Sequence, residues 1–133
     1  MEAIEKVGLM DIKDTVISEL SGGQLQRVFL AKIFAQDPEV ILLDEPTNHL
    51  DLKYQIEILE YLKSWAKTKN RIVIGVFHDL NLVNLFSENV ILLNDGKILG
   101  KGNPKEVFLE DVLQEVYNIN IKKFMINSLE KWL

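Results

Sequence analysis

The chain has 133 residues, of which 47% are hydrophobic and 26% charged, a composition typical of one globular domain and not of a disordered chain. Its formal net charge is −5, so we expect no broad basic surface for nucleic acid. Cysteine is absent, which excludes disulfides and thiolate metal sites, and no run approaches the about 20 apolar residues of a membrane span.

Two helices are predicted in the first 36 residues. Residues 3–7 fit a short helix that Gly8 stops, and residues 24–36 fit a longer helix that ends before the Asp37-Pro38 pair. Apolar side chains in the longer segment recur at helical spacing, at Leu25, Val28, Phe29 and Ile33.

A strand, a helix and a second strand are predicted between residues 40 and 77. Residues 40–43 are wholly apolar, as in a strand covered on both faces, and residues 71–77 form a second apolar run. The helix between them carries one apolar stripe, made of Ile58, Leu59, Leu62, Trp65 and Ala66. Such a unit implies parallel strands joined by a right-handed crossover.

The last third of the chain predicts a helix, a hairpin and short helical segments. Residues 78–86 suit a helix, and residues 90–99 read as a β-hairpin with an Asn-Asp-Gly turn at residues 94–96. Short helical patterns follow residue 104, and residues 118–124 form a possible strand. The expected fold class is therefore α/β, with a parallel sheet flanked by helices and a C-terminal hairpin.

Three ionisable side chains follow the two predicted strands. Asp44 and Glu45 come directly after the first strand and His78 after the second, and the carboxyl ends of parallel strands lie at the same edge of a sheet. There, one acid can hold Mg²⁺, the next can deprotonate an attacking water, and the imidazole can donate to a phosphate oxygen. The alternative is structural: the acids cap a turn and the histidine belongs to the core.

The segment LSGGQ, residues 20–24, places two glycines at the start of a helix. Ser21 and Gln24 match a capping box, which explains a helix start but not Gly22 and Gly23, since each glycine in a helix costs about 1 kcal/mol relative to alanine. Glycines leave the first-turn N–H groups bare, and these groups favour an anion such as phosphate. A plain cap and an anion site both fit the pattern.

In this order, the motifs resemble those of the ATP-binding-cassette (ABC) ATPases. The resemblance rests on LSGGQ, on VILLDEPTNHLD at residues 40–51 and on VFHDLNL at residues 76–82, and it extends over residues 4–108. The surrounding sequence looks most like importer ATPases for iron chelates, haem or cobalamin. The resemblance implies a P-loop NTPase-like fold.

The resemblance also implies a role for each motif residue. The signature residues are expected to contact the γ-phosphate of ATP held by the opposite subunit: Ser21, Gly22, Gly23 and Gln24. Asp44 resembles the acid associated with Mg²⁺, Glu45 the catalytic base and His78 the switch histidine. Asp51 belongs to the loop that meets its counterpart across the dimer, whereas His49 in the same turn is assigned no chemistry.

A P-loop, G-x-x-x-x-G-K-[ST], is missing from the sequence. The resemblance therefore implies the second half of a cassette, beginning within its helical subdomain. Residues 1–36 would be part of that subdomain, and residues 37–133 the C-terminal part of the ATPase core. We expect the isolated chain to bind ATP weakly or not at all, and to self-associate through uncovered apolar surface.

The implied function is that of the C-terminal portion of an ABC ATPase, which hydrolyses ATP with Mg²⁺ as a homodimer and drives import through transmembrane permease subunits. Such a subunit is cytoplasmic and peripheral, held at the inner face of the cell membrane through the permease. Two alternatives remain. One is a naturally short, non-catalytic assembly or regulatory module; the other is a non-transport cassette of the translation-factor type, in which the phrase DEPTNHLD also occurs.

Overall fold

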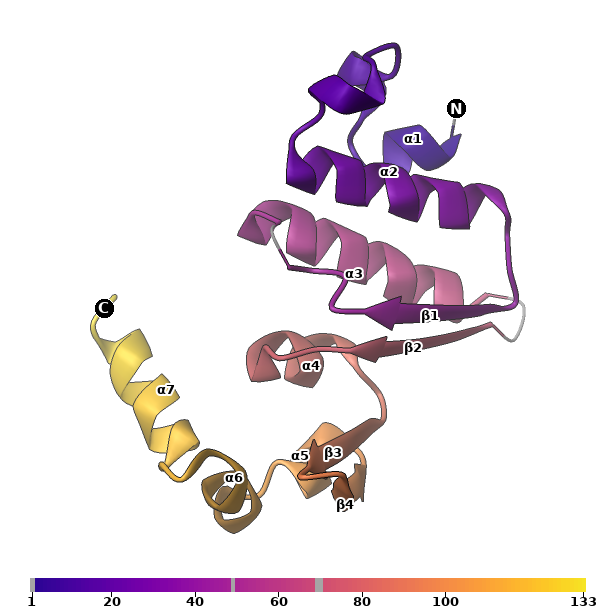
Figure 1. Ribbon diagram of the computed structural model, residues 1–133. Helices are drawn as coiled ribbons and strands as arrows, with labels where there is room; N and C mark the ends of the chain where they lie inside the picture. The colour runs from indigo at the N-terminus through magenta and orange to yellow at the C-terminus, as the bar shows by residue number, and fades with distance from the viewer. Residues whose placement is uncertain (1, 49, 69–70) are drawn as a thin grey trace. The chain divides into compact units, whose positions relative to one another are not determined.

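The computed structural model describes residues 2–48, 50–68 and 71–133, which form two compact units divided after Leu82 (Figure 1). The first unit contains α1 (Glu2–Lys6), the 3-10 turns Met10–Ile12 and Ile17–Glu19, α2 (Gly22–Ala35), β1 (Val40–Asp44), α3 (Leu52–Ala66), β2 (Ile72–Val76) and the start of α4 (Leu80–Phe86). No helix in the described ranges is long and apolar enough to cross a membrane. The expected subdomain boundary at residue 36 remains a prediction.

The strand–helix–strand unit is confirmed. β1 and β2 pair in parallel, with Val40 opposite Ile72 at one end and Asp44 opposite Val76 at the other, and α3 forms the crossover. The expected stripe of α3 is buried in the core at Ile58, Leu59, Leu62 and Trp65. Together with the helices this sheet makes the α/β fold that the sequence predicts.

One face of the β1–β2 sheet is open in the part of the chain that the structure describes. Ile41 is buried, but Leu42 beside it is 72% exposed, so burial alternates along the strand. We call the exposed apolar side chains of the two strands the open face; they are Val40, Leu42, Ile72, Ile74 and Val76. The expectation that the first strand is covered on both faces is therefore wrong for the described residues, because only one face has a partner.

The buried face of α2 includes a cation, Arg27. Phe29 is 57% exposed, and the buried side chains are those of Arg27, Leu30, Ala31 and Phe34. Arg27 takes an inner position because its Nη1 donates to the carbonyls of Val7 and Gly8, each at 3.1 Å, where α1 has ended. Its guanidinium also lies 3.8 Å from the ring centre of Tyr54. Hydrophobic spacing alone overlooks a cation with such partners.

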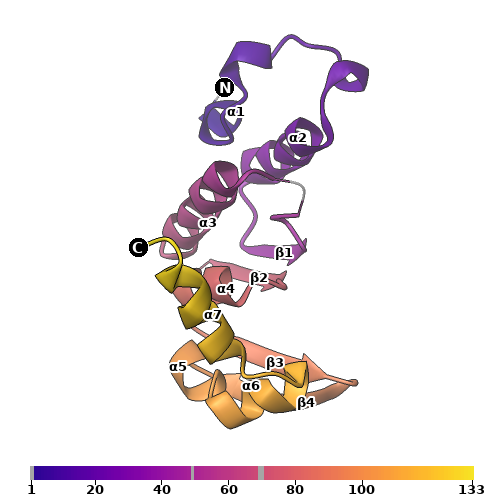
Figure 2. The same ribbon diagram turned by 90° about the vertical axis from the view of Figure 1, so that its left-hand side faces the viewer.

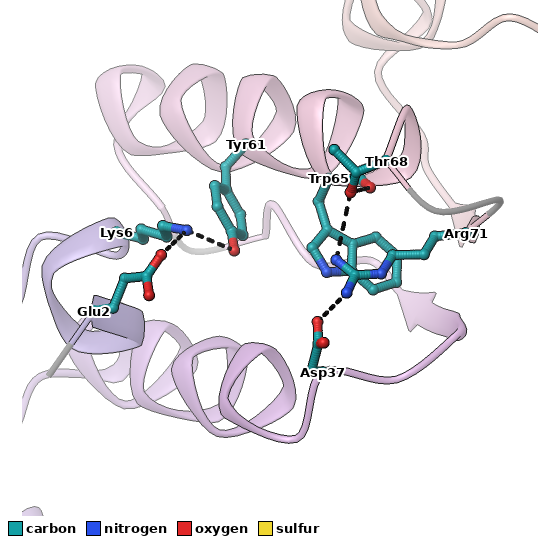
Figure 3. A network of polar contacts seen from close by, with 7 residues as sticks. All are labelled: Glu2, Lys6, Asp37, Tyr61, Trp65, Thr68 and Arg71. Carbon is teal, nitrogen blue, oxygen red and sulfur yellow. Dashed lines mark hydrogen bonds and ion pairs between the residues drawn. The ribbon is translucent and has the colours of Figure 1, made fainter.

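The first three helices pack together within this unit (Figures 1 and 2). The rings of Phe34 in α2 and Tyr61 in α3 meet edge to face, with their centres 4.4 Å apart. Lys6 of α1 donates to the Tyr61 hydroxyl at 3.4 Å and pairs with Glu2 at 2.7 Å (Figure 3). The hydrogen bond that Lys6 donates to Glu2 raises the pKa of Lys6, so the ammonium stays charged.

Arg71 fixes the amino ends of the two parallel strands (Figure 3). It precedes β2 and forms an ion pair with Asp37, which precedes β1 and lies 34 residues earlier. Its guanidinium lies 4.6 Å from the ring centre of Trp65, and its Nη1 is 3.5 Å from Oγ1 of Thr68. These contacts hold both chain segments entering the sheet, which supports the observed register.

The second unit contains the rest of α4 and then the predicted hairpin, β3 (Val90–Asn94) and β4 (Lys97–Gly102), which pair antiparallel. Asp95 and Gly96 have φ values of 47° and 72°, as the type I′ turn of an Asn-Asp-Gly sequence requires. The expected helical segments follow as α5 (Pro104–Val107) and α6 (Glu110–Tyr117). A Cβ added at Gly100 would come within 2.9 Å of Val107, so glycine permits this close packing.

The possible strand at residues 118–124 is wrong. Asn118 ends α6 in a left-handed conformation, and the chain then enters α7 (Ile121–Glu130). The side chain of Asn120 accepts from the backbone N–H of Lys123 at 2.9 Å and so caps the new helix. The alternation of asparagine and isoleucine in this segment resembles a strand pattern, but Asn118 ends one helix and Asn120 caps the start of the next.

Candidate active site

Glu45 and His78 meet where β1 and β2 end. Nε2 of His78 lies 2.5 Å from Oε1 of Glu45, although the two residues are 33 positions apart in the chain. The backbone N–H of Glu45 donates to the carbonyl of Val76 at 3.1 Å, which continues the strand pairing by one residue. The imidazole is 73% exposed and the carboxylate 38% exposed, so a ligand can reach both. The structure thus brings together two of the three groups predicted at this edge.

The backbone of Glu45 adopts a left-handed conformation, with φ at 47°. For a residue with a Cβ this backbone conformation costs roughly 1–2 kcal/mol, so it persists only where the surrounding structure imposes it. Asn48 supplies part of that support, because its N–H donates to the Glu45 carbonyl at 3.1 Å and its Nδ2 donates to Oε2 of the carboxylate. Both carboxylate oxygens of Glu45 therefore have a partner within the chain.

Asp44 is the last residue of β1 and is exposed, on the same side of the strand as Leu42. The described residues contain no group of three or more histidine, cysteine or acidic side chains that could hold a metal ion by themselves. Mg²⁺ is nevertheless commonly held by one or two carboxylates, with phosphate oxygens and waters completing its shell. An exposed carboxylate beside Glu45 fits that requirement, and its role in holding Mg²⁺ remains a prediction.

The capping box at the start of α2 is formed. The backbone N–H of Gln24 donates to Oγ of Ser21 at 3.3 Å, and Oε1 of Gln24 accepts from the Ser21 N–H at 2.8 Å. A Cβ added at Gly22 would meet no atom within 4 Å, so packing inside the chain does not demand glycine at this position. The cap explains Ser21 and Gln24, whereas Gly22 leaves the helix start open to an approaching group.

Asp51 is the N-cap residue of α3, but its side chain makes no capping hydrogen bond and is exposed. Its backbone carbonyl begins the helix by accepting from the N–H groups of Tyr54 and Gln55 at 2.9 and 3.1 Å. The carboxylate is therefore available to a partner outside the chain, as the predicted dimer contact requires. His49 lies outside the described residues.

Two glutamines that sequence reasoning missed hold the loop around Glu45. Gln26 of α2 donates through Nε2 to the carbonyl of Pro46 at 2.6 Å and approaches that of Glu45 at 3.5 Å. Gln55 of α3 donates to the carbonyls of Thr47 and Leu50 at 3.1 and 3.0 Å. In sequence both look like polar residues of exposed helix faces, and only the packing of α2 and α3 against this loop identifies them.

Comparison with known proteins finds similarity to ABC transporter proteins. A family model described as ABC transporter matches residues 1–48. The petrobactin import ATP-binding protein YclP of Bacillus subtilis is 38% identical over 120 residues, which cover 90% of this chain and 48% of YclP. The chain is therefore similar to the ATP-binding proteins of ABC transporters. Its match lies in the C-terminal portion of the relatives.

Two other ABC proteins extend this similarity. The iron(3+)-hydroxamate import ATP-binding protein FhuC of Bacillus subtilis is 42% identical over 118 residues, covering 89% of this chain and 44% of FhuC. A solved dimer of the ATP-binding cassette MJ0796, bound to ADP and Pi, superposes with a TM-score of 0.71 at 34% identity, covering 77% of this chain and 44% of that one. The chain thus spans about half the length of the curated relatives it matches.

Proposed function

We propose that this chain is the C-terminal portion of an ABC ATPase subunit that hydrolyses MgATP and couples hydrolysis to the import of an iron chelate. The contact between Glu45 and His78 at the carboxyl ends of two parallel strands carries the proposal, because it joins a candidate base to a candidate phosphate ligand. The importer names of YclP and FhuC support the iron-chelate class.

Glu45 is the proposed base. Hydrolysis requires a group that accepts a proton from water as the water attacks the γ-phosphorus. A carboxylate has about four lone-pair positions, so Glu45 can still accept from water while His78 and Asn48 occupy one position on each oxygen. His78 then holds Glu45 in place through Nε2, and a ring that carries hydrogen on both nitrogens can also donate from Nδ1 to a phosphate oxygen.

The remaining motif residues surround the same nucleotide in the proposal. Asp44 would hold Mg²⁺, which when bound neutralises charge on the phosphate oxygens. The open helix start at Ser21, Gly22, Gly23 and Gln24 would contact the γ-phosphate of ATP held by a second subunit, where bare N–H groups and the helix dipole favour an anion. Asp51, with its free carboxylate, would meet the second subunit at the same interface.

The proposed partners are a second ATPase subunit and the transmembrane permease subunits of an importer. The MJ0796 structure is a cassette dimer with ADP and Pi, which supports the first of these. We place the protein on the inner face of the cell membrane, held there by the permease. For the isolated chain we propose self-association, because the open face presents a contiguous set of exposed apolar side chains.

The proposal is tested by joining the portion of YclP that this chain does not match to the N-terminus of the chain, and by measuring ATP hydrolysis. We expect the joined protein to hydrolyse MgATP, the 133-residue chain to show no turnover, and Glu45→Gln in the joined protein to abolish turnover while ATP still binds. Glu60→Gln, an exposed change of the same kind on α3, is the matched control. Full turnover in the Glu45→Gln protein would contradict the proposal.

A further inference from the structure

Gln26 connects two parts of the candidate site that lie far apart in sequence. It belongs to the second turn of α2, the helix that Ser21 caps. Its carboxamide crosses to the loop that follows β1, where Nε2 donates to the carbonyl of Pro46 at 2.6 Å and lies 3.5 Å from the carbonyl of Glu45. The side chain is half-buried, so water competes only partly for these carbonyls.

Gln55 of α3 holds the far end of the loop that Gln26 contacts, at the carbonyls of Thr47 and Leu50, so the Glu45–Pro46 end depends on other contacts. Glu45 stands in a left-handed conformation that a non-glycine residue adopts only under constraint, and Pro46 can donate no backbone hydrogen bond of its own. The backbone bonds that hold the turn run from Glu45 to Val76 and from Asn48 to Glu45, each at 3.1 Å. Gln26 supplies the contact from α2 that holds the carbonyl groups of Glu45 and Pro46 in this turn.

We propose that Gln26 is a positioning residue that holds Glu45 in register with His78 by tying the Glu45–Pro46 backbone to the helix bearing the Ser21–Gln24 turn. A displacement of α2 is then transmitted to the carboxylate through one side chain, and Gln26 couples the two halves of the site within one subunit. This inference rests on the proposed role of Glu45 in hydrolysis. The contact itself can be tested without any turnover.

Hydrogen exchange of the 133-residue chain, followed by mass spectrometry, tests the contact. Gln26→Glu keeps the length of the side chain but sets a carboxylate against two carbonyl oxygens, whereas Gln26→Lys retains an N–H donor. Gln36→Glu, an exposed change of the same charge at the end of α2, is the control. The measured peptide contains the protected N–H groups of Glu45, Asn48 and Leu50.

We expect Gln26→Glu to exchange about five- to tenfold faster in this peptide, while Gln26→Lys and Gln36→Glu exchange at the rate of the unaltered chain. Peptides from β1 and β2 should keep their protection. Unchanged exchange in Gln26→Glu overturns the proposal, as does equal acceleration in the Glu and Lys variants, which would indicate packing. If Gln26→Glu unfolds the whole unit, the exchange of the loop peptide in Gln26→Lys decides the question. Protection equal to that of the unaltered chain supports the proposal, and lost protection overturns it.

A kinetic measurement in the YclP-joined protein separates this inference from the proposed function. If the joined protein hydrolyses ATP, Gln26→Glu should lower kcat at least tenfold with an unchanged KM for MgATP, and Gln26→Lys should restore most of it. Loop loosening without any effect on kcat would refute the coupling to Glu45. A joined protein without turnover would instead refute the proposed function and leave the exchange result to judge the contact.

Discussion

Nε2 of His78 contacts Oε1 of Glu45 at 2.5 Å, and the whole of α3 lies between the two residues in the chain. The contact depends on strand pairing, because Asp44 is opposite Val76 and the Glu45 N–H bonds to the Val76 carbonyl. Each strand thus delivers one chemical group to the same place, and substitutions of either group should affect one common function.

Replacing His78 should slow hydrolysis more than it weakens ATP binding. In the YclP-joined protein, His78→Ala removes the contact to Glu45 and the proposed phosphate ligand, so we expect kcat to fall about 10²-fold. His78→Gln, which retains a donor, should lose less. Steady-state kinetics with MgATP measures both, and an unchanged kcat in His78→Ala would exclude His78 from the site.

Two substitutions of Ser21 separate a plain helix cap from an anion site. Aspartate also caps helices, so Ser21→Asp should keep the stability of α2, but its negative charge should repel a phosphate and abolish turnover in the joined protein. Ser21→Ala should instead cost about 1 kcal/mol of unfolding free energy. Denaturant unfolding and ATPase assays measure the two effects, and an active Ser21→Asp protein would leave only the cap.

The open face should govern the oligomeric state of the isolated chain. Leu42→Lys introduces a charge at its most exposed member and should convert self-associated chain to monomer in light scattering. Val16→Lys is the control, because Val16 is 61% exposed but lies outside the sheet. Monomer in the unaltered chain, or association that persists in Leu42→Lys, would argue against the open face as the contact.

The core beneath the sheet should be sensitive at Ile58. This side chain is 1% exposed, so Ile58→Ala should lower the unfolding free energy by about 2–5 kcal/mol, whereas Ile56→Ala on the outer side of α3 should cost less than about 1 kcal/mol. Urea unfolding in the Leu42→Lys background measures both without interference from association. Equal losses in the two variants would contradict the assigned orientation of α3.

Local signals in the sequence predicted the elements whose structure depends on neighbouring residues. The turn at Asp95 and Gly96 and the stripe of α3 around Ile58 are confirmed, because turn chemistry and helical spacing are short-range properties. The burial of Arg27 in α2 was not predicted, since its guanidinium is held inside by the carbonyl of a residue 20 positions earlier. No periodicity in the sequence contains that information.

The site was predictable where it depends on the topology of the sheet. Topology alone places Glu45 and His78 at one edge of a parallel sheet, and the structure has them in contact. The roles of Gln26 and Gln55 could not be predicted, because a polar side chain in a helix normally faces water. Their carbonyl partners become visible only when the loop is seen between two helices.

The parallel pairing of β1 and β2 has a consequence for the order in which the protein folds. Val40 and Ile72 are partners across 32 residues, so the strands cannot align until the intervening segment has closed a long loop, an entropic cost that local contacts do not share. The carboxylate–imidazole contact should therefore form late, after the helices. Its appearance in a refolding experiment would mark the moment when the proposed catalytic pair is assembled.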